Sequence, residues 1–259
     1  MSNRSWNTQA LVLSLSVFGE GHREAALLTE DHGLIHAAVF GGAKSKMRAL
    51  VSPYHSGTAW LYTDPVKSAT KITDFEVKAW RQGIRENLVR TWCAALCAEI
   101  ITRSHGVADW RFANGFLDGI SVSDENECRI GLLRYLWRSL GTAGIAPDIT
   151  VCARCGDSLR ASNSAESGGK AGKNKVVYYS ACEDACLCEI CTQPDEQAFR
   201  LSENVLSYLD AIDHERPSFV RGISLDQKDF SALRQFLFFL VSRMVGGPLK
   251  TLETGEGIL

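Results

Sequence analysis

Two CxxC motifs, Cys152-Ala-Arg-Cys155 and Cys188-Glu-Ile-Cys191, organise the second half of this 259-residue sequence. Two residues between the cysteines let one tight turn direct both sulfurs at a single metal ion, and two such turns complete a tetrahedral site. Four thiolate ligands leave no open position for water, so a metal held in this way stabilises a fold and does not activate a nucleophile. The spacing therefore predicts one structural Zn²⁺ ion bound by Cys152, Cys155, Cys188 and Cys191.

The remaining cysteines leave alternatives for this site. Cys182 and Cys186 lie next to the second motif, so either could replace one of the four ligands, or the cluster could act in redox chemistry. Iron–sulfur ligation is less favoured, because the spacing matches neither common ferredoxin pattern. Three further cysteines lie on apolar helical faces, where we expect core packing: Cys93, Cys97 and Cys128.

The chain before Trp80 has the pattern of short β-strands. Apolar stretches occur at residues 11–17, 25–28, 34–40, 58–62 and 69–75, and Gly, Pro and Asp residues separate them. Five short strands in a segment of this size indicate a small closed barrel, and an OB-fold is the commonest match.

The chain after Trp80 has the three-to-four-residue period of helices. One helix is expected from Ile84 to a stop near Gly106, and others are expected at residues 110–120, 124–140 and, after a Ser202 cap, 205–212. A last helix should begin at an Asp226 cap and end at Gly246-Gly-Pro248. Between the two CxxC motifs, the Gly- and Ser-rich residues 161–173 are expected to form a flexible loop.

These patterns predict an α+β multidomain fold. Residues 1–79 would form an N-terminal OB-fold β-barrel that binds nucleic acid. Residues 80–259 would form a helical domain with an inserted four-cysteine zinc module at residues 150–193.

Charge is nearly balanced overall, since the formal net charge is −2, so a nucleic-acid site must be a local patch. The clearest patch is Gly41-Gly-Ala-Lys-Ser-Lys-Met-Arg48, within a stretch from His32 to Thr63 that contains no acidic residue. Glycines let a backbone approach phosphates closely, and Lys44, Lys46 and Arg48 supply positive charge. The alternative is an ordinary solvated hairpin loop.

Other residues would extend this patch if they share its face of the barrel. The basic candidates are Arg23, Lys71 and Lys78. Trp60 and Tyr62 alternate on an expected strand and could stack on bases. One face of a barrel strand also needs large residues, however, and we expect at least one of the two in the core.

Three common enzymatic motifs do not occur in the sequence: the P-loop, G-x-S-x-G and the Rossmann fingerprint. His22-Arg-Glu24 matches half of a zinc deaminase motif, but Pro147 is not adjacent to Cys152, and the second CxxC motif would fill the coordination sphere. No segment resembles a signal peptide or a membrane span, so we expect a cytoplasmic protein that is not an enzyme.

Short segments along nearly the whole chain resemble the bacterial RecO family of recombination mediators and DNA repair proteins. In the N-terminal part they are Ala10-Leu-Val-Leu13 with Gly19-Glu20, and Thr29-Glu-Asp-His-Gly-Leu-Ile35 followed by the 41–48 segment. Further on they are Leu132-Leu133, Leu140-Gly141, Pro147, Cys152-Ala-Arg-Cys155-Gly156, Leu233-Arg-Gln-Phe-Leu-Phe238 and Leu249-Lys250. Their order and spacing are specific, whereas Cys182-Glu-Asp-Ala-Cys186 and the 161–173 loop depart from the family pattern.

The resemblance implies an OB-fold, a helical domain and a zinc module. It also implies binding of single- and double-stranded DNA, strand annealing, and loading of recombinase onto DNA covered by single-strand-binding protein. The implied partners are RecR and the single-strand-binding protein, and the implied location is the cytoplasm in association with the nucleoid. A competing hypothesis is a zinc-containing protein-interaction adaptor with no nucleic-acid site of its own, which the near-neutral charge favours.

Overall fold

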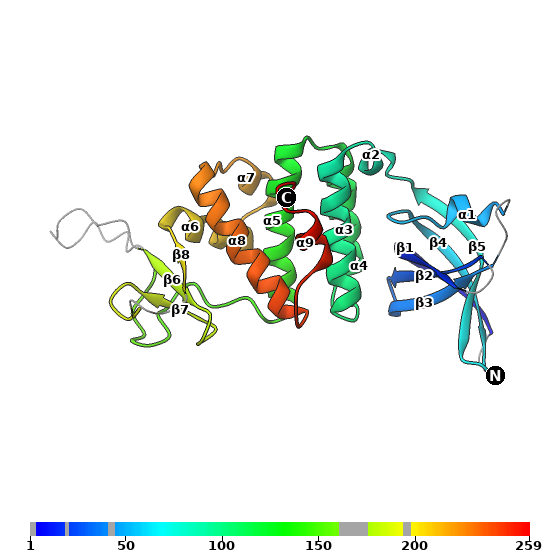
Figure 1. Ribbon diagram of the computed structural model, residues 1–259, viewed down its shortest axis with the longest axis horizontal. Coiled ribbons are helices and arrows are strands. Elements are labelled where there is room, and N and C mark those ends of the chain that lie inside the picture. Colours follow the sequence, from blue (N-terminus) through cyan, green and yellow to red (C-terminus); the bar gives the residue numbers. More distant parts are fainter. Residues whose placement is uncertain (1–3, 19–20, 41–44, 161–175, 194–197) are drawn as a thin grey trace. The chain divides into compact units, whose positions relative to one another are not determined.

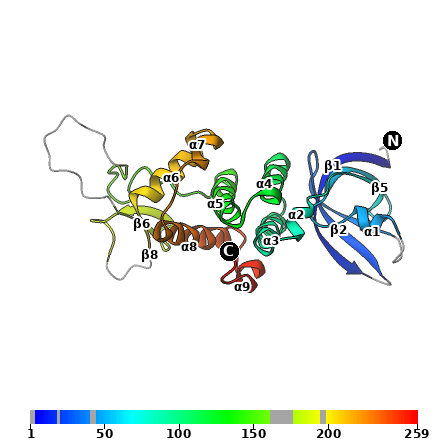
Figure 2. The ribbon, with the colours of Figure 1, turned by 90° about the horizontal axis from the view of Figure 1, so that it is seen from above.

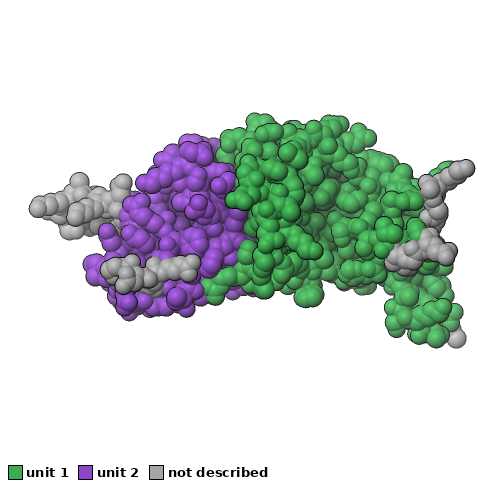
Figure 3. Space-filling view, viewed as in Figure 1, with its two compact units in different colours: residues 1–132, 242–259 green, residues 133–241 purple. Residues whose placement is uncertain are grey.

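The computed structural model describes residues 4–18, 21–40, 45–160, 176–193 and 198–259 (Figure 1). Internal contacts divide the chain into two compact units, one formed by residues 1–132 with 242–259 and the other by residues 133–241 (Figure 3). The division falls within two helices, α5 (Glu125–Thr142) and α8 (Gln227–Met244). In the part of the chain that the structure describes, no helix is both long and apolar enough to cross a membrane.

The first unit begins with a strongly curled five-stranded sheet (Figures 1 and 2). Its strands are β1 (Ser5–Phe18), β2 (His22–Thr29), β3 (Gly33–Val39), β4 (Ser56–Asp64) and β5 (Ala69–Ala79). The order is β1-β2-β3-β5-β4, and β4 pairs back onto β1. A short helix, α1 (Met47–Leu50), lies between β3 and β4 in the sequence. All five predicted strands are present, and the sheet is OB-like.

The five strands close into a barrel, as the sequence predicts, but one of its seams is much shorter than the others. Strands β3 and β5 run parallel and meet through the single pair Ala38–Lys71, whereas each of the other strand pairs is an extended antiparallel ladder. The β3–β5 seam therefore closes the barrel through its shortest ladder. A weak seam of this kind agrees with the partly open barrel that is general for OB-folds.

The middle of β1, at residues 10–13, and the second half of β2, at residues 25–29, are buried on both faces. Ala10 and Val12 of β1 point into the barrel core, while Leu11 points outward and is equally buried. Its partner on β2, Leu28, also points outward and is fully buried. Helices α3 (Leu88–Arg103) and α4 (Trp110–Val122) contact β1 and provide the cover.

Side chains cap the two long helices that follow the barrel, Asn87 at α3 and Asp109 at α4. One expectation is wrong: the helix predicted to run on from Ile84 is interrupted, because α2 (Gln82–Arg85) ends before Asn87, whose side chain caps α3 by accepting a hydrogen bond from the Arg90 amide (3.1 Å). At the end of the chain, both carboxylate oxygens of Glu99 accept amide hydrogen bonds (2.8 Å each) from the first turn of α9 (Lys250–Thr254). Glu99 thereby holds α9 against α3.

The second unit combines a small sheet with helices. Strands β6 (Val177–Ser180), β7 (Ala185–Cys188) and β8 (Ala198–Leu201) form a sheet in the order β7-β6-β8. Helices α6 (Glu203–His214) and α7 (Pro217–Arg221) follow, and Ser202 caps α6 as expected by accepting from the Val205 amide (3.2 Å). Tyr179 is fully buried, and its ring packs edge-on against Phe236 of α8 at 5.1 Å. The sheet is therefore anchored on α8 by aromatic packing.

Arg81 joins the barrel to the helices inside the first unit. Its side chain is only 3% exposed, and it donates to the Tyr54 carbonyl (2.7 Å), the Asn114 amide oxygen (2.8 Å) and the Asp118 carboxylate (2.7 Å). Nearby, His55 is buried between the Leu50 carbonyl, 2.9 Å from its Nδ1, and the guanidinium of Arg85. Burial and these arginine charges lower the pKa of His55, so its neutral ring donates to Leu50 and accepts from Arg85.

We predict that Arg81→Met lowers the free energy of unfolding by about 2–3 kcal/mol, because it leaves the Tyr54 and Asn114 oxygens without their charged donor. Asp118→Asn should cost less than about 1 kcal/mol, because that side chain is 59% exposed. Urea denaturation of the two variants, followed by tryptophan fluorescence, measures the difference. Equal losses for both variants would contradict a buried junction that depends on Arg81.

Candidate metal centre and nucleic-acid surface

The first CxxC motif forms a tight turn. The Cys152 amide donates to the Asp157 carbonyl (2.8 Å), and the Gly156 amide donates back to the Cys152 carbonyl (2.9 Å). Gly156 has a φ of 75°, a left-handed conformation that glycine adopts without the steric cost of a side chain. The turn therefore needs the glycine that follows the second cysteine.

The second CxxC motif begins at the end of β7. Amides of Cys191 and Thr192 both donate to the Cys188 carbonyl at 3.1 Å, which closes the turn. The two turns are also bonded to each other, because the Ala153 amide donates to the Cys186 carbonyl (3.0 Å) and the Cys188 amide to the Cys152 sulfur (3.4 Å). Backbone hydrogen bonds thus place the two motifs face to face.

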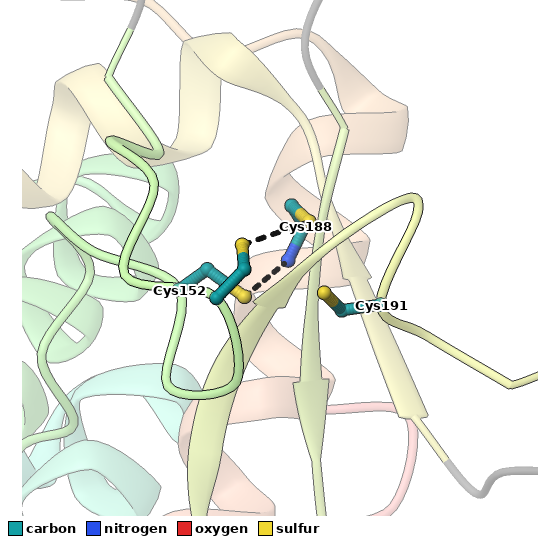
Figure 4. A group of neighbouring side chains, drawn as sticks. Cys152, Cys188 and Cys191 are labelled. Carbon is teal, nitrogen blue, oxygen red and sulfur yellow. Dashed lines mark hydrogen bonds between the residues drawn. The ribbon is translucent and has the colours of Figure 1, made fainter.

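The four predicted ligands form one cluster. The sulfur atoms of Cys152, Cys155, Cys188 and Cys191 all lie within 4.8 Å of one another. Figure 4 shows the side chains of Cys152, Cys188 and Cys191 pointing toward a common centre. A tetrahedral Zn²⁺ ion with Zn–S bonds of about 2.3 Å requires sulfurs about 3.8 Å apart, and the Cys155 and Cys188 sulfurs are 3.8 Å apart. The donor set and its dimensions fit such an ion.

The protonation of the sulfurs also suits metal binding. Burial opposes ionisation of Cys152, but amides of Cys155, Cys188 and Arg154 outweigh it and lower the pKa of that thiol to about 6. The Asp157 amide favours the Cys155 thiolate, yet hydrogen bonds with the Cys152 and Cys191 sulfurs raise the pKa of Cys155 to about 12. Without an ion, the cluster therefore keeps a proton that a bound metal must displace, so metal affinity falls as the pH is lowered.

Arg154 links the two motifs. Its guanidinium donates to the Glu183 carboxylate (2.8 Å from Nε) and to the carbonyl of Cys191. A positive charge here partly offsets the two negative charges that four thiolates and one divalent ion would leave.

The remaining cysteines near the site lie apart from the cluster. Cys186 is buried on β7, and burial raises the pKa of its thiol to about 12. Cys182 is exposed in the turn between β6 and β7. Among the described residues, the sulfur cluster comprises the four cysteines of the two CxxC motifs and includes neither of these two.

The basic residues proposed to contact DNA are spread over the barrel. Lys44 lies outside the described residues. Lys46 is exposed just before α1, and Arg48 is half-buried in that helix. Arg23 pairs with Val39 on β3, next to the Ala38–Lys71 pair that joins the seam, so Arg23 and Lys71 lie near the same end of the barrel.

Lys78 lies elsewhere. It is seven positions after Lys71 on β5, which at the rise of a strand separates the two residues by roughly 23 Å. Its ammonium group donates to the Gln9 side chain (3.2 Å). The six candidates therefore do not form a single patch among the residues that are described.

Trp60 and Tyr62 lie on the outer face of β4. The inward positions of that strand are Ala59 and Leu61, which belong to the barrel core, so the two aromatic side chains point away from it. Both are partly exposed, and the Lys71 ammonium lies 5.0 Å from the centre of the Tyr62 ring. This excludes the expectation that either ring fills the core.

The outer face also carries polar residues that the sequence reasoning missed. Asn7 pairs with Trp60, and Gln9 pairs with Thr58 and donates to its hydroxyl (3.1 Å). Their period-two alternation in Ser-Trp-Asn-Thr-Gln, just before an apolar run, was the available signal.

Two family models match the chain. The model described as recombination protein O N terminal matches residues 1–80, and the model described as recombination protein O C terminal matches residues 85–253. The first match covers the barrel, and the second covers the helices and the cysteine cluster.

We predict that Cys155→Ala removes bound zinc and lowers the melting temperature by at least roughly 4–8 °C, because a closed site depends on every ligand. Elemental analysis by mass spectrometry and differential scanning calorimetry report the two effects. Cys182→Ala is the matched control, and it should keep both the metal and the melting temperature. A zinc-free Cys155→Ala protein of unchanged stability would show that the cluster has no structural role.

Proposed function

The chain belongs to the recombination protein O family, and from this membership we propose that it is a recombination mediator that binds single- and double-stranded DNA and anneals strands. We further propose that it helps to load recombinase onto DNA covered by single-strand-binding protein. Its proposed partners are RecR and the single-strand-binding protein. Membership of this family supports a role in DNA repair and recombination. The observation that supports the finer proposal is a family match over both parts of the chain, the first of them an OB-like barrel with exposed lysines.

Within this proposal, residues 1–79 form the DNA-binding domain, and residues 80–259 form the helical domain with its zinc module at residues 150–193. Lys46, Arg48 and Lys71 would contact phosphates, with Arg23 near the same end of the barrel. Contacts of this kind are independent of sequence and weaken with salt. Two strands held by these basic residues of one barrel have a raised local concentration, which favours annealing.

The proposed zinc ion acts through stability. Four sulfurs fill a tetrahedral site and leave no position for a substrate or a water molecule. The two motifs lie at one end of the β6–β7–β8 sheet, which the aromatic contact of Tyr179 with Phe236 anchors on α8. In this proposal the protein acts through binding and not through catalysis, and the metal ion keeps the second unit folded. We place it in the cytoplasm at the nucleoid.

Salt titration of DNA binding tests the proposal. Each phosphate contact with a single strand contributes about 0.7 to the slope of log K against log salt concentration. Lys46→Gln combined with Arg48→Gln should therefore flatten the slope by about 1.4 and weaken binding at low salt. Fluorescence anisotropy of a labelled oligonucleotide with zinc-loaded protein, and no partner protein, gives the slope.

The matched control is Arg221→Gln with Lys228→Gln, which removes the same charge from exposed positions of the second unit. It should leave the slope unchanged. Equal effects of the two double variants would show that net charge, and not this part of the barrel, governs binding. No binding by the unaltered protein at low salt would favour the adaptor hypothesis instead.

A further inference from the structure

Among the described residues, one outer face of the barrel carries side chains that are exposed or half-buried. It is formed by the first half of β1 with β4 and β5, and strand pairing aligns its outward residues in rows. These rows are Ser5–Tyr62–Lys71, Asn7–Trp60–Asp74 and Gln9–Thr58–Glu76. We call this surface the β1–β4–β5 face.

The outer face that OB-folds generally use for ligands, on their second and third strands, is partly blocked in this chain. Outward residues Ala26 and Leu28 of β2 are buried. The backbone of Gly106, which follows α3, packs so closely on Leu34 of β3 that an added Cβ would lie 2.8 Å from the leucine Cβ. A ligand that stacks on exposed aromatic rings must therefore bind to another face of the barrel.

Trp60 and Tyr62 give the β1–β4–β5 face the geometry of a stacking platform. They are two residues apart on one strand, so their Cα atoms are about 7 Å apart and both rings lie on the same side. The register between β4 and β5 shifts at Trp60–Leu61, where the hydroxyl of the extra residue Thr73 donates to the Trp60 carbonyl (3.1 Å). Bulges of this kind increase the local twist and redirect side chains.

Polar groups around the rings suit an unpaired nucleotide chain. The amides of Asn7 and Gln9 can bond base edges, whereas Lys71 and Lys78 stand at opposite ends of the face and can contact phosphates. Asp74 and Glu76 lie between the two lysines and repel phosphates. Negative charge in the middle and positive charge at the ends favour an arrangement with bases over the rings and phosphates at the lysines.

We propose that the β1–β4–β5 face binds single-stranded DNA by stacking unpaired bases on Trp60 and Tyr62. The inference rests on the proposed function and adds that single strands and duplexes are recognised through different contacts. Bases in a duplex are stacked on one another and offer only their edges, so a duplex gains nothing from the two rings and depends on phosphate contacts alone. The aromatic pair therefore selects single strands.

The test uses full-length, zinc-loaded protein with Trp60→Leu and Tyr62→Leu, alone and combined. Anisotropy with an oligothymidylate should show binding weakened roughly 5- to 100-fold for each lost stacking contact. Binding of a duplex of equal length should change less than about twofold, and the slope against salt should stay the same, because no phosphate contact is lost.

Two controls accompany these variants. Tyr62→Phe keeps the ring and should keep the affinity for the single strand. Phe219→Leu removes an aromatic side chain that is 59% exposed in the second unit, and it should change neither affinity. Thermal denaturation identifies any variant that has lost its fold.

A measurement on the unaltered protein does not depend on the folding of variants. An oligonucleotide that contains 5-iodouracil is cross-linked by light and the modified peptide is identified by mass spectrometry. Cross-links at Trp60 or Tyr62 support the platform, and cross-links confined to other parts of the chain overturn it.

The outcomes separate the two proposals. If the unaltered protein binds the single strand and the leucine variants bind it equally well, the platform is wrong and DNA binding stands. If the leucine variants lose single-strand and duplex binding to the same degree, the face does not select single strands. If the unaltered protein binds no DNA at low salt, the proposed function fails and the platform fails with it.

Discussion

Burial of the middle of β1, at residues 10–13, on both faces of the strand is the constraint on which the first unit depends. Ala10 and Val12 fill the barrel, while Leu11 is buried on the opposite side with Leu28 of β2. A strand in this position must be apolar at successive residues, which explains the unbroken run Ala10-Leu-Val-Leu13. It also attaches the barrel to α3 and α4, since exposing Leu11 and Leu28 to water would cost about 1.5–3 kcal/mol for each side chain. Arg81 satisfies the backbone and side-chain oxygens that this junction buries.

The same burial decides which surfaces remain for a ligand. Helices cover the β1–β2 side of the barrel, and the polar half of β1, with β4 and β5, stays accessible. The partly exposed aromatic residues Trp60 and Tyr62 lie there, whereas the basic residues Lys46 and Arg48 lie at the start of α1. In the proposed function the two surfaces bind different parts of DNA. The aromatic rings bind unpaired bases, and the basic side chains bind the phosphates of any strand.

The cysteine cluster organises the second unit by a different principle. Hydrogen bonds between the two motifs, and the bridge that Arg154 makes to Glu183 and the Cys191 carbonyl, bring four sulfurs together. The β6–β7–β8 sheet that bears the second motif is short, and an aromatic contact with α8 forms part of its core. Small sheets gain little stability from burial alone, so a metal ion would supply what the apolar core does not. A role of this kind needs no contact between the metal and DNA.

Local chemistry allowed the sequence alone to determine much of this protein. The spacing of the CxxC motifs indicated the four sulfurs, apolar stretches between turn residues indicated the five strands, and Ser202 and Asp226 marked helix starts, because each signal depends on residues a few positions apart. Only the tertiary structure decided which distant residues share a surface. Strand register placed Tyr62 beside Lys71 and left Lys78 at the other end of β5, and it confined the β3–β5 seam to Ala38–Lys71. Pairing between strands far apart in the chain sets these positions, and the residue pattern of one strand does not indicate which residues it pairs with.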